Sequence, residues 1–406
     1  MSLVVQKFGG TSVGTPQKIR AIAERIAETY ASGHQLIVVV SAMGHTTDEL
    51  VELAYKVSKK PKNREMDMLL TAGERISMAL LSMALEDLKI QAMSFTGSQT
   101  GIITDGNHCR ARIKKILGDR VKNAISENKV AIVAGFQGVS ESKEITTLGR
   151  GGSDTTAVAL AAVLNADICE IYTDVDGIFS ADPRIVKKAK LIKRIPHDLM
   201  VEMAFRGAGV LHYRSVDLAK KYGVKLVVKN SFKESEGTEV VNREVIKDTI
   251  KGMEEYQVLA VADDASKIFL KINLMRPTVA SAIWEFSSKN HLAAIAPMFY
   301  DGQMFFYIEK DAEDEWKKGL EKLTHDGFVK SFEVIRNQVP VSLIGNRFLQ
   351  DCTSLAEISD ALASHDILVT HGVASPLAIT VSVAASRKDE AVKILHRKFI
   401  ENSDCL

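Results

Sequence analysis

The first residues that could do chemistry are Lys-Phe-Gly-Gly-Thr-Ser at positions 7–12. They follow an apolar run that predicts a strand. Thr15-Pro16 after them predicts the start of a helix, with threonine as N-cap and proline at the first helical position. A glycine turn between a strand and a helix N-terminus exposes backbone N–H groups at the positive end of the helix dipole, and these bind anions. The stretch therefore predicts a nucleotide-phosphate site formed by Lys7, Phe8, Gly9 and Gly10.

This stretch matches neither of the two common phosphate motifs. A Walker A loop requires Lys-Ser or Lys-Thr after its last glycine, whereas Lys7 precedes both glycines. The Gly-x-Gly-x-x-Gly dinucleotide fingerprint is also absent. A structural strand–turn–helix corner explains the two glycines as well as a phosphate site does, so these residues alone leave both interpretations open.

A second glycine-rich stretch, Gly-Arg-Gly-Gly-Ser-Asp at positions 149–154, precedes a run of small and apolar residues that predicts a buried helix over 157–164. Three glycines around an arginine at a helix N-terminus predict a second anion site. The planar guanidinium of Arg150 is suited to bidentate binding of a carboxylate. Capping of the helix is an equal alternative for Asp154. Two anion sites in one domain favour a function over two structural corners.

Hydroxyl groups follow the next predicted strand. The unbroken apolar run at 36–40 is typical of a strand buried on both faces of a parallel sheet. Ligands of such sheets bind at the carboxyl ends of the strands, so Ser41 and Thr47 are candidate substrate donors. Capping of the following helix by Thr46 or Thr47 is the alternative.

A helical pattern covers about residues 65–88 and contains Gly73, which costs about 1 kcal/mol relative to alanine in a helix interior. A helix that begins near Thr71, or the close approach of another segment, would explain this glycine. Spacing does not decide whether the neighbouring Glu74 is a surface carboxylate or binds an amine.

Three aspartates in the segment 173–184 suggest a cation-binding loop. EF-hand spacing fails, because the glycine comes too early and no glutamate closes a twelve-residue loop. A structural turn is the alternative. Lys229 lies at the carboxyl end of a further predicted strand, 225–230, where it is either a ligand contact or a surface lysine.

These stretches together resemble the aspartokinase branch of the amino-acid kinase family. Lys-Phe-Gly-Gly-Thr-Ser-Val at 7–13 is similar to the N-terminal signature of that branch, in which threonine follows the two glycines. Gly-Arg-Gly-Gly-Ser-Asp-Thr-Thr-Ala at 149–157 resembles its most specific motif without a gap. The resemblance implies an α/β fold with an open, mainly parallel sheet flanked by helices.

The resemblance also implies roles for single residues. Lys7 would stabilise phosphoryl charge and Asp154 would orient Lys7, so these two are the expected catalytic residues. The glutamate of a matching Gly-Glu pair holds the substrate amino group in aspartokinases, which implies this role for Glu74. Further implied nucleotide contacts are Thr173, Asp174, Phe179, Arg184 and Lys229. The implied substrate residues are Ser41, Thr47, Glu74, Arg150, Gly151, Gly152 and Ser153.

The implied reaction is transfer of the γ-phosphate of ATP to the side-chain carboxylate of L-aspartate, the entry step to lysine, threonine and methionine. A carboxylate is already ionised at pH 7, so its phosphorylation needs no general base. Positioning and cationic stabilisation of the transferring group are then the main requirements, with Mg²⁺ on the phosphates. The sequence does not identify the protein ligands of the metal. The alternatives are a kinase for another amino-acid carboxylate and a catalytically silent amino-acid sensor.

Length and composition agree with a globular enzyme. A chain of 406 residues predicts two or three domains, and 46% hydrophobic with 25% charged residues is ordinary for globular proteins. A net charge of +1 favours neither nucleic acid nor an anionic membrane as partner. The four cysteines lack paired spacing, which argues against disulfides and a zinc site. With no signal segment or membrane-length apolar run recognised, a cytoplasmic location is expected.

The C-terminal half has a different pattern. Residues 267–335 predict a complete βαββαβ unit, and a second unit from residue 339, with strands at 367–370 and 377–384, lacks its last strand. The predicted strand 256–262 has the right length to fill that place, which makes the first unit an insertion in the second. This repeat resembles the paired ACT domains of aspartokinases and implies a homo-oligomer. The predicted domains are 1–240 (catalytic), 241–255 (linker), 264–336 (first ACT-like) and 256–263 with 337–406 (second ACT-like).

The ACT-like units depart from the family in the loop after their first strand. Aspartokinases usually have Pro-Gly there, which lets an effector such as lysine or threonine reach the backbone. The first unit reads Met-Arg-Pro-Thr at 275–278 and the second Gly-Asn-Arg-Phe-Leu at 345–349. A β-branched residue and the bulky Phe348 would obstruct the pocket, which predicts a dimerisation platform with weak or absent inhibition. A rearranged pocket with other contacts is the alternative.

Overall fold

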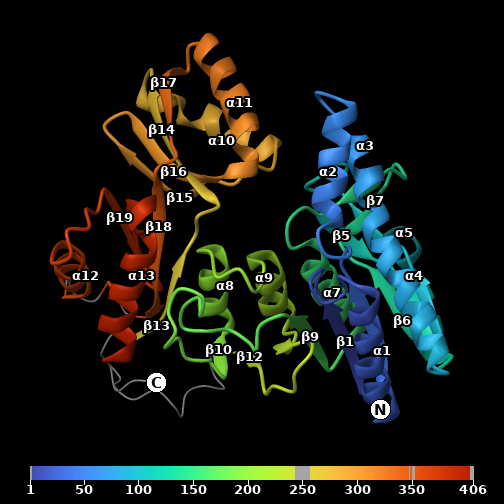
Figure 1. Cartoon of the computed structure of the whole chain (residues 1–406). Helices are drawn as coiled ribbons and strands as arrows, with labels where there is room; N and C mark the ends of the chain where they lie inside the picture. Colours follow the sequence, from blue (N-terminus) through green and yellow to red (C-terminus); the bar gives the residue numbers. More distant parts are fainter. Residues whose placement is uncertain (1, 243–256, 347, 350–352, 403–406) are drawn as a thin grey trace. The chain divides into compact units, whose positions relative to one another are not determined.

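The computed structural model describes residues 2–242, 257–346, 348–349 and 353–402 (Figure 1). These residues divide into two compact units. The first contains most of the described residues before 243. The second contains those from 257 onward, together with the short segments 179–190 and 205–208. Nearly all of the predicted linker, 241–255, lies outside the described residues.

The first unit is organised around an eight-stranded sheet with strand order β10-β12-β11-β9-β1-β2-β6-β3. All neighbouring strands are parallel except β11 and β12. This confirms the predicted α/β fold class. The strands are β1 Leu3–Phe8, β2 Gln35–Val40, β3 Ala92–Phe95, β6 Val130–Ala134, β9 Ile168–Thr173, β10 Arg194–Pro196, β11 Leu226–Asn230 and β12 Thr238–Val241.

Helices cover both faces of this sheet. Helices α1 and α4, which lie side by side in Figure 1, pack with alternate residues of β1, β2 and β6 in one hydrophobic cluster. Helix α7 packs against β1, β2 and β9. Because side chains alternate along a strand, the residues of β1 point in turn toward α1 and toward α7. The helices are α1 Pro16–Ala31, α2 Thr46–Val57, α3 Asn63–Leu70, α4 Ala72–Asp87, α5 Gly97–Thr100, α6 Asp119–Ser126, α7 Gly152–Leu164, α8 His197–Phe205 and α9 Tyr213–Tyr222.

A second, smaller sheet of the first unit was not expected from the sequence. Its strand order is β5-β4-β7-β8. The strands are β4 Ile102–Thr104, β5 Ile113–Ile116, β7 Gln137–Ser140 and β8 Ile145–Thr147. Strands of three or four residues are too short to show a clear alternation of apolar and polar side chains.

The helical pattern over 65–88 forms two helices, α3 and α4, which are divided at Thr71. Both explanations considered for Gly73 hold. Helix α4 begins one residue before it, and a Cβ atom on Gly73 would lie 2.7 Å from the Cβ of Ala42. The span Asn63–Asp87 is long and apolar enough to cross a membrane. However, Leu81 and Leu85 of α4 lie in the hydrophobic cluster on the sheet, as in a core helix.

The second unit contains two four-stranded antiparallel sheets, β15-β16-β14-β17 and β13-β18-β20-β19. Strand β13 pairs with β18, the first strand of the second βαββαβ unit. It thus fills the place of that unit's missing last strand, as the sequence predicted. The strand predicted at 367–370 is wrong, since the edge strand is β19, His371–Ser375. The other strands are β13 Gln257–Asp263, β14 Lys267–Leu274, β15 Ile295–Tyr300, β16 Gln303–Glu309, β17 Val329–Ile335, β18 Gln338–Asn346 and β20 Ala378–Ala384. The helices are α10 Ala280–Lys289, α11 Glu313–His325, α12 Thr353–Ala363 and α13 Lys388–His396.

Candidate active site

A buried ion pair joins the two glycine-rich stretches. Lys7 lies near the end of β1, and its Nζ is 2.6 Å from Oδ1 of Asp154 in the first turn of α7. The two side chains are 11% and 10% exposed, so little water screens the pair. Oδ1 of Asp154 makes no hydrogen bond of good geometry with the described residues, so the contact is ionic rather than well directed. The ammonium therefore faces the N-terminus of α7, where an anion would be held.

Asp154 does not cap this helix. The N-cap residue is Gly151, with a left-handed φ of 66°, and no side chain makes a capping hydrogen bond. The helix begins at Gly152, five residues before the predicted start. The capping alternative for Asp154 is therefore wrong, and its carboxylate is available to orient Lys7.

The loop after β1 packs closely on the loop after β2. A Cβ atom on Gly10 would lie 2.9 Å from the carbonyl oxygen of Ala42, so this position requires glycine. The backbone N–H of Gly44 donates to the carbonyl oxygen of Gly10 at 2.9 Å. Gly9 lies beside the ammonium group, since a Cβ there would be 3.5 Å from Nζ of Lys7. The carboxyl ends of β1 and β2 thus form one surface.

Glu74 is a buried carboxylate at this surface. It is 3% exposed, and its Oε1 accepts a hydrogen bond of 3.2 Å from the backbone N–H of Ala42. Its Oε2 has no hydrogen-bond partner among the described residues. Burial raises the pKa of Glu74 to about 7. An unpaired, desolvated carboxylate oxygen is suited to an ammonium ligand, and Glu74 is no surface residue.

Ser41 and Thr47 lie on either side of the same loop. Both are half-buried, and neither hydroxyl makes a side-chain hydrogen bond to a described residue. Helix α2 starts at Thr46 after His45, without a side-chain cap. The capping alternative for the threonines is therefore wrong as well.

The second glycine stretch is held by aromatic rings. A Cβ atom added to Gly151 would lie 2.1 Å from the Cβ of His212, so this glycine packs directly against the histidine. Gly152 packs on Phe136. Phe136 has a left-handed φ of 67°, which is rare for a bulky residue and typical of functional sites. The sequence did not predict this strain. Ser153 is buried beside Gly135, whereas Arg150 is exposed.

Phe8 and Lys229 lie on the other face of the sheet from Lys7. The ring of Phe8 is fully buried and stacks on Tyr172, with ring centroids 4.8 Å apart. Nζ of Lys229 donates to Glu170 at 2.6 Å. Burial raises the pKa of Glu170, but the hydrogen bond and charge of Lys229 outweigh burial and hold this pKa below its ordinary value. Neither side chain is therefore beside the Lys7–Asp154 pair.

The remaining predicted nucleotide residues are divided between the two units. Oγ1 of Thr173 donates to the carboxylate of Asp174 at 3.1 Å in the first unit. Phe179 and Arg184 belong to the second unit, where the guanidinium of Arg184 is 2.7 Å from Asp182. The structure thus brings together Lys7, Gly9 and Asp154, and separately Gly10 and Glu74 around Ala42. Among the described residues, no group of three or more His, Cys, Asp or Glu could hold a metal ion.

The parallel sheet, with a glycine loop and a buried lysine at its carboxyl edge, defines the class of protein. Residues 2–230 match the model of the amino acid kinase family. The two glycine-rich stretches and the Lys7–Asp154 pair all lie within this range.

Curated relatives place the chain in one branch of that family. It is 43% identical to an aspartokinase of Mycolicibacterium smegmatis, and the match covers 98% of this chain and 96% of the relative. It is 40% identical to an aspartokinase of Bacillus sp. (strain MGA3), and that match covers 98% of this chain and 97% of the relative. The chain belongs to the aspartokinases. Its fold is also similar to E. coli aspartokinase III, solved with aspartate and ADP, with a TM-score of 0.84 and 23% identity over 97% of this chain and 99% of that one.

Proposed function

We propose that this protein is an aspartate kinase, which transfers the γ-phosphate of ATP to the side-chain carboxylate of L-aspartate. Its membership of the aspartokinases along nearly the whole chain is the observation that carries the proposal. The reaction yields 4-phospho-L-aspartate and ADP, and it opens the synthesis of lysine, threonine and methionine.

The described residues support a mechanism based on positioning and charge. The acceptor carboxylate is ionised at neutral pH, so no side chain has to remove a proton. The ammonium of Lys7 stabilises negative charge on the transferring phosphoryl group, and Asp154 holds that ammonium in place. The burial of both side chains strengthens this electrostatic effect.

Substrate recognition is assigned to the surface around the loop after β2. The free Oε2 of Glu74 accepts the ammonium group of aspartate, and the exposed guanidinium of Arg150 binds its carboxylate. The other proposed substrate residues are Ser41, Thr47, Gly151, Gly152 and Ser153. The proposed nucleotide residues are Phe8, Gly9, Gly10, Thr173, Asp174, Phe179, Arg184 and Lys229, of which Phe8 contributes through its backbone because its ring is buried.

We further propose that Mg²⁺ accompanies ATP. Mg²⁺ usually keeps several water ligands and binds substrate phosphates with one or two carboxylates. The described acidic residues fit this mode, since they form no dedicated cage and Asp174 is exposed near the end of β9. The metal would neutralise charge on the phosphates, while Lys7 acts on the phosphoryl group.

We propose that the chain is organised into four parts. These are a catalytic domain at 1–240, a linker at 241–255, a first ACT-like domain at 264–336 and a second ACT-like domain formed by 256–263 with 337–406. The ACT-like domains join copies of the chain into a homo-oligomer in the cytoplasm. Edge strand β15 supports this proposal, because its Phe299 and Tyr300 are 55% and 75% exposed. Sedimentation velocity of the wild type and of Phe299→Glu measures the association.

A steady-state assay tests the substrate assignment. ADP formation from ATP and Mg²⁺ is measured with L-aspartate, L-glutamate and N-acetyl-L-glutamate, and we expect activity with L-aspartate. Arg150→Lys should raise the KM for aspartate more than the KM for ATP, because the bidentate guanidinium fork is lost. Activity with another carboxylate would identify a different kinase, and no activity with any acceptor would indicate a silent sensor.

A further inference from the structure

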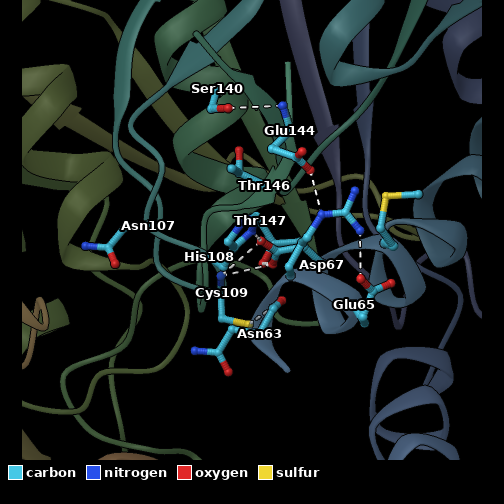
Figure 2. A network of polar contacts seen from close by, with 12 residues as sticks. Asn63, Glu65, Asp67, Asn107, His108, Cys109, Ser140, Glu144, Thr146 and Thr147 are labelled. Carbon is cyan, nitrogen blue, oxygen red and sulfur yellow. Dashed lines mark hydrogen bonds and ion pairs between the residues drawn. The ribbon is translucent and has the colours of Figure 1, made fainter. Parts of the chain in front are cut away.

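A buried carboxylate outside the assigned site anchors the loop between β4 and β5 (Figure 2). Asp67 of α3 is fully buried. Its Oδ2 is 2.6 Å from Nδ1 of His108, and both of its oxygens accept from the backbone N–H of Cys109, at 3.0 and 3.2 Å. Oδ1 also accepts from the hydroxyl of Thr147 at 2.6 Å. These donors satisfy a charge that would otherwise be costly to bury.

The donors come from two segments that are distant in sequence. His108 and Cys109 belong to the β4–β5 loop, while Thr147 is the last residue of β8. The two segments are also joined directly, since the N–H of Ala111 donates to the carbonyl oxygen of Thr147 at 2.9 Å. Asp67 therefore fixes both segments on α3.

The segment that Asp67 fixes also contacts the residues directly before Arg150. A Cβ on Gly149 would lie 3.0 Å from the carbonyl oxygen of Cys109, so the β4–β5 loop packs directly on Gly149. The carbonyl oxygen of Leu148 accepts a hydrogen bond of 2.6 Å from the guanidinium of Arg214. The backbone N–H of Leu148 donates to the carbonyl oxygen of Phe136 at 2.8 Å. The residues that precede Arg150 are thus held on each side.

We propose that Asp67 and His108 are positioning residues that set the place of Arg150 for the carboxylate of the substrate. The proposal deepens the proposed function and rests on it. Arg150 directly follows Gly149, which packs on the loop that Asp67 fixes, so Asp67 sets the backbone position from which the guanidinium group extends. The carboxylate of Asp67 accepts several directed hydrogen bonds and therefore fixes the geometry of the backbone before Arg150. Residues that hydrogen-bond to ligand-binding groups orient those groups in the same way in other proteins.

Four variants test this role. Asp67→Asn removes the charge, and His108→Ala removes the donor to Oδ2. His108→Asn keeps an amide nitrogen near the place of Nδ1 and should restore the contact. Arg64→Ala is the matched control: Arg64 also belongs to α3, but its exposed side chain pairs with Glu144 at 2.8 Å and Glu65 at 2.7 Å.

We expect Asp67→Asn and His108→Ala to raise the KM for aspartate by about tenfold or more and to leave the KM for ATP within about twofold. The KM of His108→Asn should lie within about threefold of the wild type, and that of Arg64→Ala should be unchanged. Thermal denaturation of each variant separates loss of folded protein from loss of affinity. If Asp67→Asn does not fold, the comparison of His108→Ala with His108→Asn decides.

An unchanged KM for aspartate in His108→Ala would overturn the inference, and so would an equal rise of the KM values for aspartate and ATP. Loss of thermal stability without a change in KM would also do so, because it would show a structural role. Failure of the proposed function is distinguishable, since the wild type itself would then form no ADP with aspartate.

Discussion

Nζ of Lys7 lies 2.6 Å from Oδ1 of Asp154, with both side chains almost fully buried. One residue comes from the first strand of the chain and the other from the first turn of α7, so the pair joins the two glycine-rich stretches into one site. Its position at the carboxyl edge of the sheet is where ligands of such folds bind. The pair is the centre of the proposed mechanism.

Replacing Lys7 by alanine should lower kcat by about 10²-fold or more, a loss of about 2.7 kcal/mol of transition-state stabilisation. The ammonium meets phosphoryl charge chiefly in the transition state, so the KM values should change less than kcat. Lys122→Ala, at an exposed position on α6, controls for the loss of one positive charge. Turnover by Lys7→Ala at the wild-type rate would refute the phosphate-site assignment.

Aspartate binding should weaken as the pH falls through 7. Burial raises the pKa of Glu74 to about 7, so the carboxylate that accepts the substrate ammonium becomes protonated below that pH. For a pKa of about 7, the Kd for aspartate at pH 6 should be about tenfold higher than at pH 8. Isothermal titration of the wild type and of Glu74→Gln measures this difference. The variant should bind weakly at both pH values, and an equal pH dependence in both proteins would remove Glu74 from the subsite.

The same carboxylate should make the ligand-free protein less stable at high pH. The pKa of Glu74 is raised on folding from 4.5 to about 7, so its neutral form is favoured in the folded state. The associated stability is fully present below about pH 4.5 and is lost as the pH rises through 7, up to about 3 kcal/mol. Glu74→Gln should therefore be more stable than the wild type at pH 8 but not at pH 4.5. Urea unfolding of the two proteins at both pH values tests this, and a constant difference between them would contradict it.

Lysine and threonine, alone or together at millimolar concentration, should inhibit weakly or not at all. Thr278 lies in the 3₁₀ turn that begins at Pro277, where a glycine would leave the backbone open to an effector. Phe348 is 1% exposed in the core around β18. Initial rates at subsaturating aspartate measure the effect, and strong inhibition by either amino acid would show a rearranged pocket instead.

Local sequence was sufficient for the glycine loops and the regular strands. Thr15 caps α1 through a hydrogen bond of 3.2 Å from the N–H of Lys18, as predicted, because N-capping depends on adjacent residues. Strands β2 and β11 follow apolar runs and lie within one residue of the bounds predicted at 36–40 and 225–230. A helix start near Thr71 was one of two explanations considered for Gly73, but Thr71 is neither proline nor glycine and carries no stop signal, so the sequence alone did not decide for it.

Contacts between distant segments could not be predicted. The face on which Lys229 lies depends on the register of β11 with β9, which places it beside Tyr172 and over Glu170. The strained backbone of Phe136 and the bond between Asp67 and His108 likewise arise from tertiary packing. Resemblance to a family supplied the role of Glu74, but its free oxygen and raised pKa follow from burial.

Trapping of the product tests the central claim most directly. The protein is incubated with ATP, Mg²⁺, L-aspartate and hydroxylamine, which converts an acyl phosphate to a hydroxamate, and the product is identified by mass spectrometry. We predict the 4-hydroxamate of aspartate, formed in amounts equal to the ADP released and reduced by about 10²-fold or more in Lys7→Ala. ADP release without hydroxamate, or hydroxamate formed from glutamate and not from aspartate, would contradict the account.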